Sequence, residues 1–209
     1  ASTKAFTSQI TALYLVTLIL GRMRHLSVEP GLSFITALER LPAQLTEILT
    51  RAETIKAVAD RYAGAPDFLF LGRGINYPVA LEGALKLKEI SYIHAEGYSA
   101  AEIKHGPIAL INEETPSLFI VPDDSLRDKV ISNMKEVKAR KGPVIALAVD
   151  GDEEVGRIAD DTIYVPHTNE LFYPFLMVVP LQLLAYYCAI KLDRNVDQPR
   201  NLAKSVTVE

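Results

Sequence analysis

Cysteine is almost absent from this 209-residue sequence, whose one cysteine is Cys188. A single thiol cannot form an internal disulfide, which excludes the disulfide-stabilised class of secreted domains. It also excludes zinc sites built from pairs of cysteines. Cys188 lies within an apolar run, residues 183–190, and free cysteines usually pack as small hydrophobic side chains. We therefore expect Cys188 to be an ordinary buried thiol.

An excess of basic residues is also lacking. Lysine and arginine total 22 against 26 aspartate and glutamate, which gives a formal net charge of −4. Nothing here indicates binding to nucleic acid or to an anionic membrane, although a single pocket can still hold an anionic substrate. The first residues contain no basic segment leading into an apolar one, so we expect no signal peptide. We expect a folded cytoplasmic protein and, because the chain starts with Ala1 rather than Met, a fragment of a longer one.

Two long apolar runs raise the question of a membrane span. Residues 171–190 carry no charge, and 20 residues are about the length that crosses a bilayer. The run contains Pro174, Pro180 and Gln182, so we expect a buried helix, with a membrane span as the alternative. The other run, residues 5–24, has helical spacing and is apolar nearly all round, which predicts a helix sandwiched between other elements.

The hydrophobic pattern changes near residue 65. Before it, only helical spacing is found, with an expected break at Pro30-Gly31 and a kink or boundary at Pro42. After it, short apolar runs (68–71, 118–121, 144–149 and 162–165) alternate with helical segments (77–92, 125–140 and 171–190). Residues 93–99 are a candidate for one further strand. This alternation predicts an α/β fold, a doubly wound parallel sheet with both faces covered by helices.

The first strand runs directly into Gly72-Arg73-Gly74. Glycines there allow a tight turn, and the N-terminus of the following helix favours anions. A dinucleotide fingerprint would need a third glycine where Tyr77 stands, and no phosphate-binding loop of the type GxxxxGK[ST] occurs. Nucleotide binding is therefore weakly supported, and a tight strand-to-helix turn is favoured.

Glu82, Lys86 and Glu89 share one face of the helix that follows. Such a stripe faces either water or a functional site, and spacing alone favours water. His105 is expected at the end of a short helix before Gly-Pro, where it either carries protons near neutral pH or caps the helix. The other histidines show no ligand spacing with it, so no metal site is expected.

Several segments together resemble a known family. Residues 1–7, 82–96, 102–107 and 197–209 closely resemble the isomerase half of the glucosamine-6-phosphate synthases, the isomerising glutamine–fructose-6-phosphate aminotransferases. The resemblance runs from end to end. It implies a flavodoxin-like sugar-isomerase (SIS) sandwich. Residues 1–63 would then be the helical remainder of a truncated first SIS subdomain, 65–192 a complete second one, and 193–209 a C-terminal active-site tail.

The resemblance also implies roles for individual residues. Lys204 matches a lysine that forms a Schiff base with the ketone, Glu89 a carboxylate that moves the proton between C1 and C2, and His105 an imidazole that opens the sugar ring. The remaining matches are sugar-contacting positions: Lys86, Ser2, Ala203 and Ala1. In the family the histidine comes from the partner subunit, so a homodimer is implied. No cofactor or metal is implied.

The implied reaction converts fructose 6-phosphate and glutamine to glucosamine 6-phosphate and glutamate, in amino-sugar and UDP-N-acetylglucosamine biosynthesis. The full enzymes carry a glutaminase domain and a Ser/Thr-rich phosphate loop that this sequence lacks, so we expect the isolated chain to be a poor catalyst. Two alternatives remain: a regulator that senses phosphosugars, and a module that mediates dimerisation only. Glu89, His105 and Lys204 favour the enzyme, and no DNA-binding helix-turn-helix is visible.

Overall fold

The computed structural model describes residues 2–201, and its centre is a five-stranded parallel sheet. The strands are β1 (Asp67–Gly72), β2 (His94–Ser99), β3 (Ser117–Val121), β4 (Val144–Val149) and β5 (Asp161–Val165). Their order across the sheet is β2-β1-β3-β4-β5, which is the flavodoxin-like order. Every residue of β3 and β4 is buried, which explains why these strands are continuous apolar runs rather than alternating ones.

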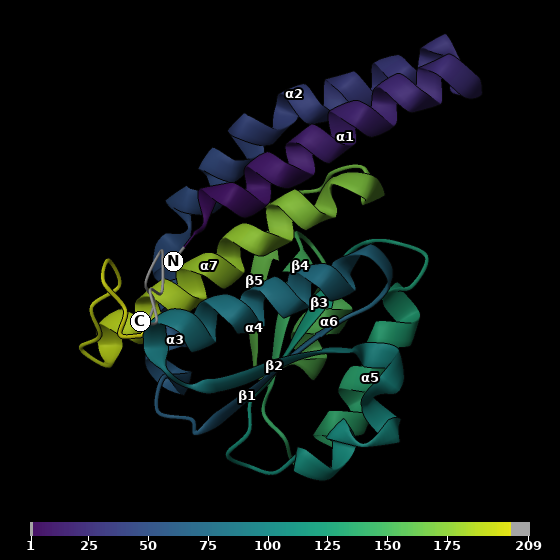
Figure 1. Ribbon diagram of the computed structural model, residues 1–209. Helices are drawn as coiled ribbons and strands as arrows, with labels where there is room; N and C mark the ends of the chain where they lie inside the picture. The colour runs from purple at the N-terminus through teal and green to yellow at the C-terminus, as the bar shows by residue number, and fades with distance from the viewer. Residues whose placement is uncertain (1, 202–209) are drawn as a thin grey trace, which may run out of the picture.

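Helices cover both faces of this sheet (Figure 1). One face carries α3 (Ala52–Tyr62), α4 (Tyr77–Ser91) and α7 (Tyr173–Lys191), whose apolar side chains form one core with the sheet. The other face carries α5 (Arg127–Lys138) and α6 (Glu153–Ile158), which share a second core with the short 3-10 helix η2 (Ala100–His105). Further 3-10 turns are η1 (Gly74–Asn76), η3 (Pro107–Leu110) and η4 (Glu170–Phe172). The predicted α/β sandwich is confirmed, including a strand within residues 93–99.

The charge-free run 171–190 is a core helix. In the described chain two helices are long and apolar enough to cross a membrane, Lys4–Arg24 and Glu170–Lys191, and the second is largely buried in the fold. It packs between α3 and α4 on the sheet, and Leu176, Leu181 and Leu184 have no exposed surface. The expectation of a buried helix is therefore confirmed for α7. Cys188 lies in this helix and is fully buried, and burial raises the pKa of its thiol to about 12.

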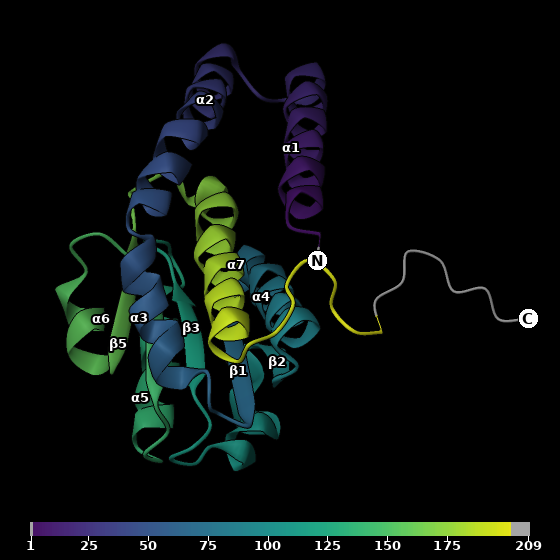
Figure 2. The same ribbon diagram turned by 90° about the vertical axis from the view of Figure 1, so that its left-hand side faces the viewer.

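The first two helices, α1 (Lys4–Arg24) and α2 (Val28–Thr50), form a hairpin that projects beyond the sheet (Figures 1 and 2). The prediction that α1 is sandwiched is wrong, because it has no buried residue within the chain. Only its first half meets the core: the ring of Tyr14 packs against Phe34, Phe172 and Phe175. Its outer half leaves apolar side chains exposed: Val16, Ile19, Leu20 and Met23.

The break expected at Pro30-Gly31 and the helix boundary expected at Pro42 are also misplaced. Pro30 is the third residue of α2 rather than a break before it, and a proline in the first turn has no intrahelical hydrogen bond to lose. Pro42 lies inside α2, which continues to Thr50, and the boundary with α3 is at Arg51. The long amphipathic stretch is therefore two helices that meet nine residues beyond the proline.

Candidate functional site

The turn between β1 and α4 positions the helix that carries the candidate residues. A Cβ atom on Gly72 would lie 2.2 Å from the backbone oxygen of Asn76, so only glycine fits there. The tight strand-to-helix turn predicted for Gly72 is therefore confirmed. Farther along α4, a Cβ on Gly83 would lie 2.7 Å from Leu181 and 3.0 Å from Phe70. Gly83 thus allows α4 to lie close to both α7 and the sheet.

The charged stripe of α4 is buried. The side chain of Lys86 is 5% exposed, that of Glu82 12% and that of Glu89 22%. The Lys86 ammonium donates to Glu89 Oε2 at 2.6 Å and lies 3.7 Å from Glu82 Oε1. The reading that spacing alone favoured, a solvated face, is wrong: α4 instead exposes Leu81 and Leu85. A helix that largely buries three neighbouring charged side chains while it exposes two leucines departs from the usual amphipathic arrangement, which marks this stripe as a candidate site.

The electrostatics of the stripe centre on one cation between two carboxylates. Burial raises the pKa of Glu82, the Lys86 ammonium opposes that shift, and the negative charge of Glu89 adds to it. The short ion pair between Lys86 and Glu89 fixes the Glu89 carboxylate in one orientation. A carboxylate held in this way is suited to accepting and returning a proton, and the neighbouring ammonium to binding an oxygen of a ligand.

Replacing Lys86 with methionine is expected to lower the free energy of unfolding by about 3 kcal/mol at pH 7.5, because two partly buried carboxylates lose their counter-ion. Without the ammonium, burial and the negative charge of Glu89 would raise the pKa of Glu82 in the folded variant above that of its unfolded chain. The folded variant would then bind extra protons, so the loss should be smaller at pH 5 and grow as pH rises. Urea unfolding at both pH values measures this.

Lys88→Met is the matched control, because Lys88 is exposed on the same helix and surface changes usually stay within about 0.5 kcal/mol. Equal stability of Lys86→Met and the unchanged protein at pH 7.5 would contradict the importance of the buried charge.

Two distant parts of the chain come near α4 and its neighbour α7. The segment after α7 returns to it, and the backbone N–H of Arg200 donates to the Tyr92 hydroxyl at 2.8 Å. Tyr92 follows α4 directly and lies three residues past Glu89. The start of α1 is tied to α7, whose Gln182 donates to the Thr3 carbonyl oxygen at 3.4 Å. In both views the start of α1 lies beside the segment after α7 (Figures 1 and 2).

The structure thus brings some of the predicted site residues together. Lys86 and Glu89 are in contact, and Ser2 lies exposed at the start of α1. Ala1, Ala203 and Lys204 lie outside the described residues. Glu82, Tyr92 and Arg200 were not predicted as site residues. Glu82 belongs to the recognised stripe, whereas neither spacing nor composition singles out Tyr92 or Arg200.

His105 does not join this group within one chain. It ends η2, as expected, before Gly106 with φ 146°, and its Nδ1 lies 2.7 Å from Glu102 Oε2. The apolar residues of η2, Ala100 and Ile103, belong to the core on the α5 face of the sheet, whereas α4 lies on the opposite face. The imidazole is 73% exposed. It is therefore an accessible histidine oriented by a carboxylate, on a surface away from Lys86.

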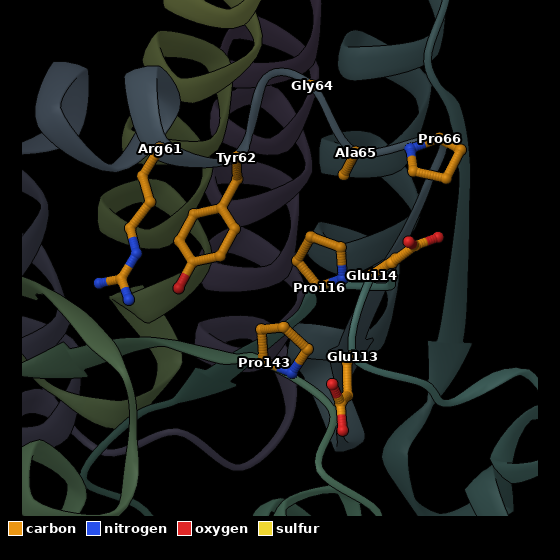
Figure 3. Close-up of a pocket in the computed structure, with 9 residues that line it drawn as sticks. All are labelled: Arg61, Tyr62, Gly64, Ala65, Pro66, Glu113, Glu114, Pro116 and Pro143. Carbon is orange, nitrogen blue, oxygen red and sulfur yellow. The ribbon is translucent and has the colours of Figure 1, made fainter.

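Other parts of the described chain offer weaker candidates. Within residues 2–201 no group of three or more histidine, cysteine, aspartate or glutamate side chains is arranged to hold a metal ion. A hollow of about 470 Å³ opens between the end of α3 and the loops before β3 and β4 (Figure 3). It lies at the amino ends of the strands, whereas open parallel sheets bind ligands at the carboxyl ends. Its Tyr62 hydroxyl is already bonded to Asp161.

Comparisons with known proteins agree on one family. The SIS domain family matches residues 62–192. Two curated relatives named glutamine–fructose-6-phosphate aminotransferase (isomerizing) match the whole chain, at 53% identity in Thermus thermophilus and 51% in Chlorobaculum tepidum. The chain spans about a third of their length, 35% and 34%. A solved structure, the C-terminal domain of glucosamine-fructose-6-phosphate aminotransferase from Francisella tularensis, matches 95% of the chain and 56% of its own, with TM-score 0.90 and 39% identity.

Proposed function

This chain belongs to the SIS domain family, and from that premise we propose that it is the sugar-isomerising part of a glutamine–fructose-6-phosphate aminotransferase. The parent protein would convert fructose 6-phosphate and glutamine to glucosamine 6-phosphate and glutamate in the cytoplasm. The observation that carries the proposal is the buried Lys86–Glu89 pair on α4, in a chain that is 53% identical over its whole length to an enzyme of that name. Residues 65–192 would form a complete second SIS subdomain, with 1–63 left from the first and 193–209 as the active-site tail.

The chemistry divides among three side chains. Lys204 would form a Schiff base with the C2 ketone, releasing water, and ammonia would then displace the lysine amine to leave a C2 imine, which makes the proton on C1 more acidic. Glu89 would take that proton and return it to C2, which turns the ketose skeleton into the 2-amino aldose. Lys86 orients Glu89 through their 2.6 Å hydrogen bond and would also contact the sugar. Ser2, Ala1 and Ala203 would bind the sugar at the start of α1 and in the tail.

His105 would open the sugar ring from a second copy of the chain. Within one chain η2 and α4 lie on opposite faces of the sheet, so His105 cannot act beside Glu89 of its own subunit. Its exposed imidazole, held by Glu102 at 2.7 Å, is available to a neighbour. The active unit would therefore be a homodimer, joined in the parent to a glutaminase domain that supplies ammonia. Residues 1–209 alone would turn over fructose 6-phosphate poorly.

Chemical trapping tests the proposal. The full-length protein that contains this chain is incubated with fructose 6-phosphate and reduced with borohydride, which fixes a Schiff base as a stable amine. Peptide mass spectrometry should find the sugar on Lys204. The adduct should persist in Lys88→Arg, which changes an exposed lysine on α4, and disappear in Lys204→Arg. An adduct on another lysine, or none, would overturn the assignment of Lys204.

A phosphosugar-sensing regulator is the alternative. It would bind the same sugar without the Schiff base, so it would give saturable binding of fructose 6-phosphate but no adduct. The match over the whole chain to proteins named aminotransferases supports the enzyme instead.

A further inference from the structure

Tyr92 has an unusual backbone conformation at the end of α4. Its φ is 67° and its ψ 11°, the left-handed region that glycine and asparagine adopt far more readily than a residue with a bulky side chain. Such a conformation in a tyrosine requires that the surrounding contacts hold it. The Tyr92 amide bonds back to the Lys88 carbonyl oxygen, which closes the last turn of the helix.

The ring of Tyr92 contacts two arginines from the segment after α7. The guanidinium carbon of Arg200 lies 4.1 Å from the ring centroid and that of Arg194 5.5 Å, both within the range of cation–π attraction. The Tyr92 hydroxyl also accepts the backbone N–H of Arg200 at 2.8 Å. One side chain therefore binds the segment through its ring face and through its hydroxyl.

The segment itself is folded so that both arginines reach the same ring. The side-chain oxygen of Asn195 accepts from the backbone N–H groups of Asp197 at 3.0 Å and Gln198 at 2.9 Å, which forms a turn between the arginines. The N–H of Arg194 donates to the Ala189 carbonyl oxygen and joins the turn to the end of α7. Residues 194–200 thus form a loop whose two ends meet at Tyr92.

We propose that Tyr92 is a positioning residue, which anchors the loop 194–200 to the end of α4 and thereby places Lys204 relative to Glu89. This inference rests on the function proposed above. Lys204 follows Arg200 by four residues in the sequence. Glu89 precedes Tyr92 by three residues on a rigid helix. Tyr92 therefore joins the element carrying the proton-transfer group to the element carrying the amine.

A shift of about 1 Å in a reacting group can cost about a hundredfold in rate. Loss of the anchor should therefore lower kcat far more than it changes KM for fructose 6-phosphate, because only Ala203 among the residues proposed to hold the sugar follows the loop. A purely structural role would lower stability and leave kcat of the folded enzyme intact.

The first arm of the test uses trypsin on the full-length protein, because trypsin needs a free arginine side chain. In Tyr92→Asn, which removes the ring but suits the left-handed backbone, cleavage after Arg194 and Arg200 should rise on the order of tenfold. Tyr92→Phe keeps the ring and should show a smaller rise. Tyr186→Phe is the matched control, since the described residues give its hydroxyl no hydrogen bond. Unchanged cleavage in Tyr92→Asn would overturn the anchor.

The second arm measures turnover of the same variants. Tyr92→Asn should lower kcat for glucosamine 6-phosphate formation on the order of tenfold with glutamine hydrolysis unchanged, and Tyr92→Phe should recover most of the rate. Arg200→Ala should resemble Tyr92→Asn, and Arg200→Lys should be intermediate. Faster cleavage with undiminished kcat would refute the positioning role. Absence of synthase activity in the full-length protein without any substitution would instead overturn the proposed function. The trypsin arm would still decide whether Tyr92 anchors the loop.

Discussion

Lys204→Ala in the full-length protein is expected to abolish formation of glucosamine 6-phosphate while glutamine hydrolysis continues. Without the amine no Schiff base forms, and the loss should exceed about a thousandfold. Glu89→Gln keeps a side chain of the same size beside Lys86 but cannot accept a proton, so a loss of about 10²–10⁴-fold is expected. Glucosamine 6-phosphate and glutamate are measured in the same reaction, which separates the two half-reactions.

Lys88→Ala serves as the control for both variants, because it removes an exposed charge from α4 without touching the buried pair. It should retain the activity of the unchanged protein. Full synthase turnover by either Lys204→Ala or Glu89→Gln would remove that residue from the mechanism. Parallel loss of glutamine hydrolysis would instead indicate a folding defect, which a thermal unfolding curve identifies.

Gly72→Ala is expected to destabilise the fold by more than about 3 kcal/mol, the range reached by severe overpacking and backbone strain. The added Cβ would lie 2.2 Å from the backbone oxygen of Asn76 and 2.7 Å from its carbonyl carbon. Both are main-chain atoms of the turn, so no side chain can rotate to relieve the clash. The turn must open, which displaces the start of α4. Urea unfolding followed by circular dichroism measures the effect.

Gly64→Ala is the matched control. Gly64 also lies in a loop on the α3 side of β1, but a Cβ there meets no heavy atom within 4 Å. Alanine at such a site usually changes stability by less than about 1 kcal/mol, often favourably. If Gly72→Ala unfolded at the same urea concentration as Gly64→Ala, the close approach of Gly72 to Asn76 would be wrong.

Residues with a regular pattern were predictable from the sequence. The runs 118–121 and 144–149 are continuous and apolar because both faces of their strands are covered, and the two glycines at and just after the end of β1 indicated the turn. The exposed outer half of α1 was not predictable, because its composition is that of a buried helix while its surroundings depend on how far the hairpin extends past the sheet.

The candidate site was predictable as a set of residues but not as an arrangement. Spacing placed Glu82, Lys86 and Glu89 on one face, yet periodicity cannot tell a buried charged face from a solvated one, because the answer depends on what packs there. The left-handed backbone conformation of Tyr92 could not be predicted, because the usual indication of that conformation in a sequence is a glycine or an asparagine. The sequence of the turn at Asn195 also gives no indication that Arg194 and Arg200 both contact the ring of Tyr92.

The central place of α7 has a consequence for synthesis on the ribosome. This helix is the last element of the described chain, yet it packs against α2, α3, α4 and β5. Chains emerge at about 5–20 residues per second, so the apolar sides of α3 and α4 stay without their partner until residues 173–191 have left the exit tunnel. The sheet can pair before then, but one whole face cannot close. Chaperones that bind nascent apolar segments should therefore engage this chain late, and release it only once α7 has been made.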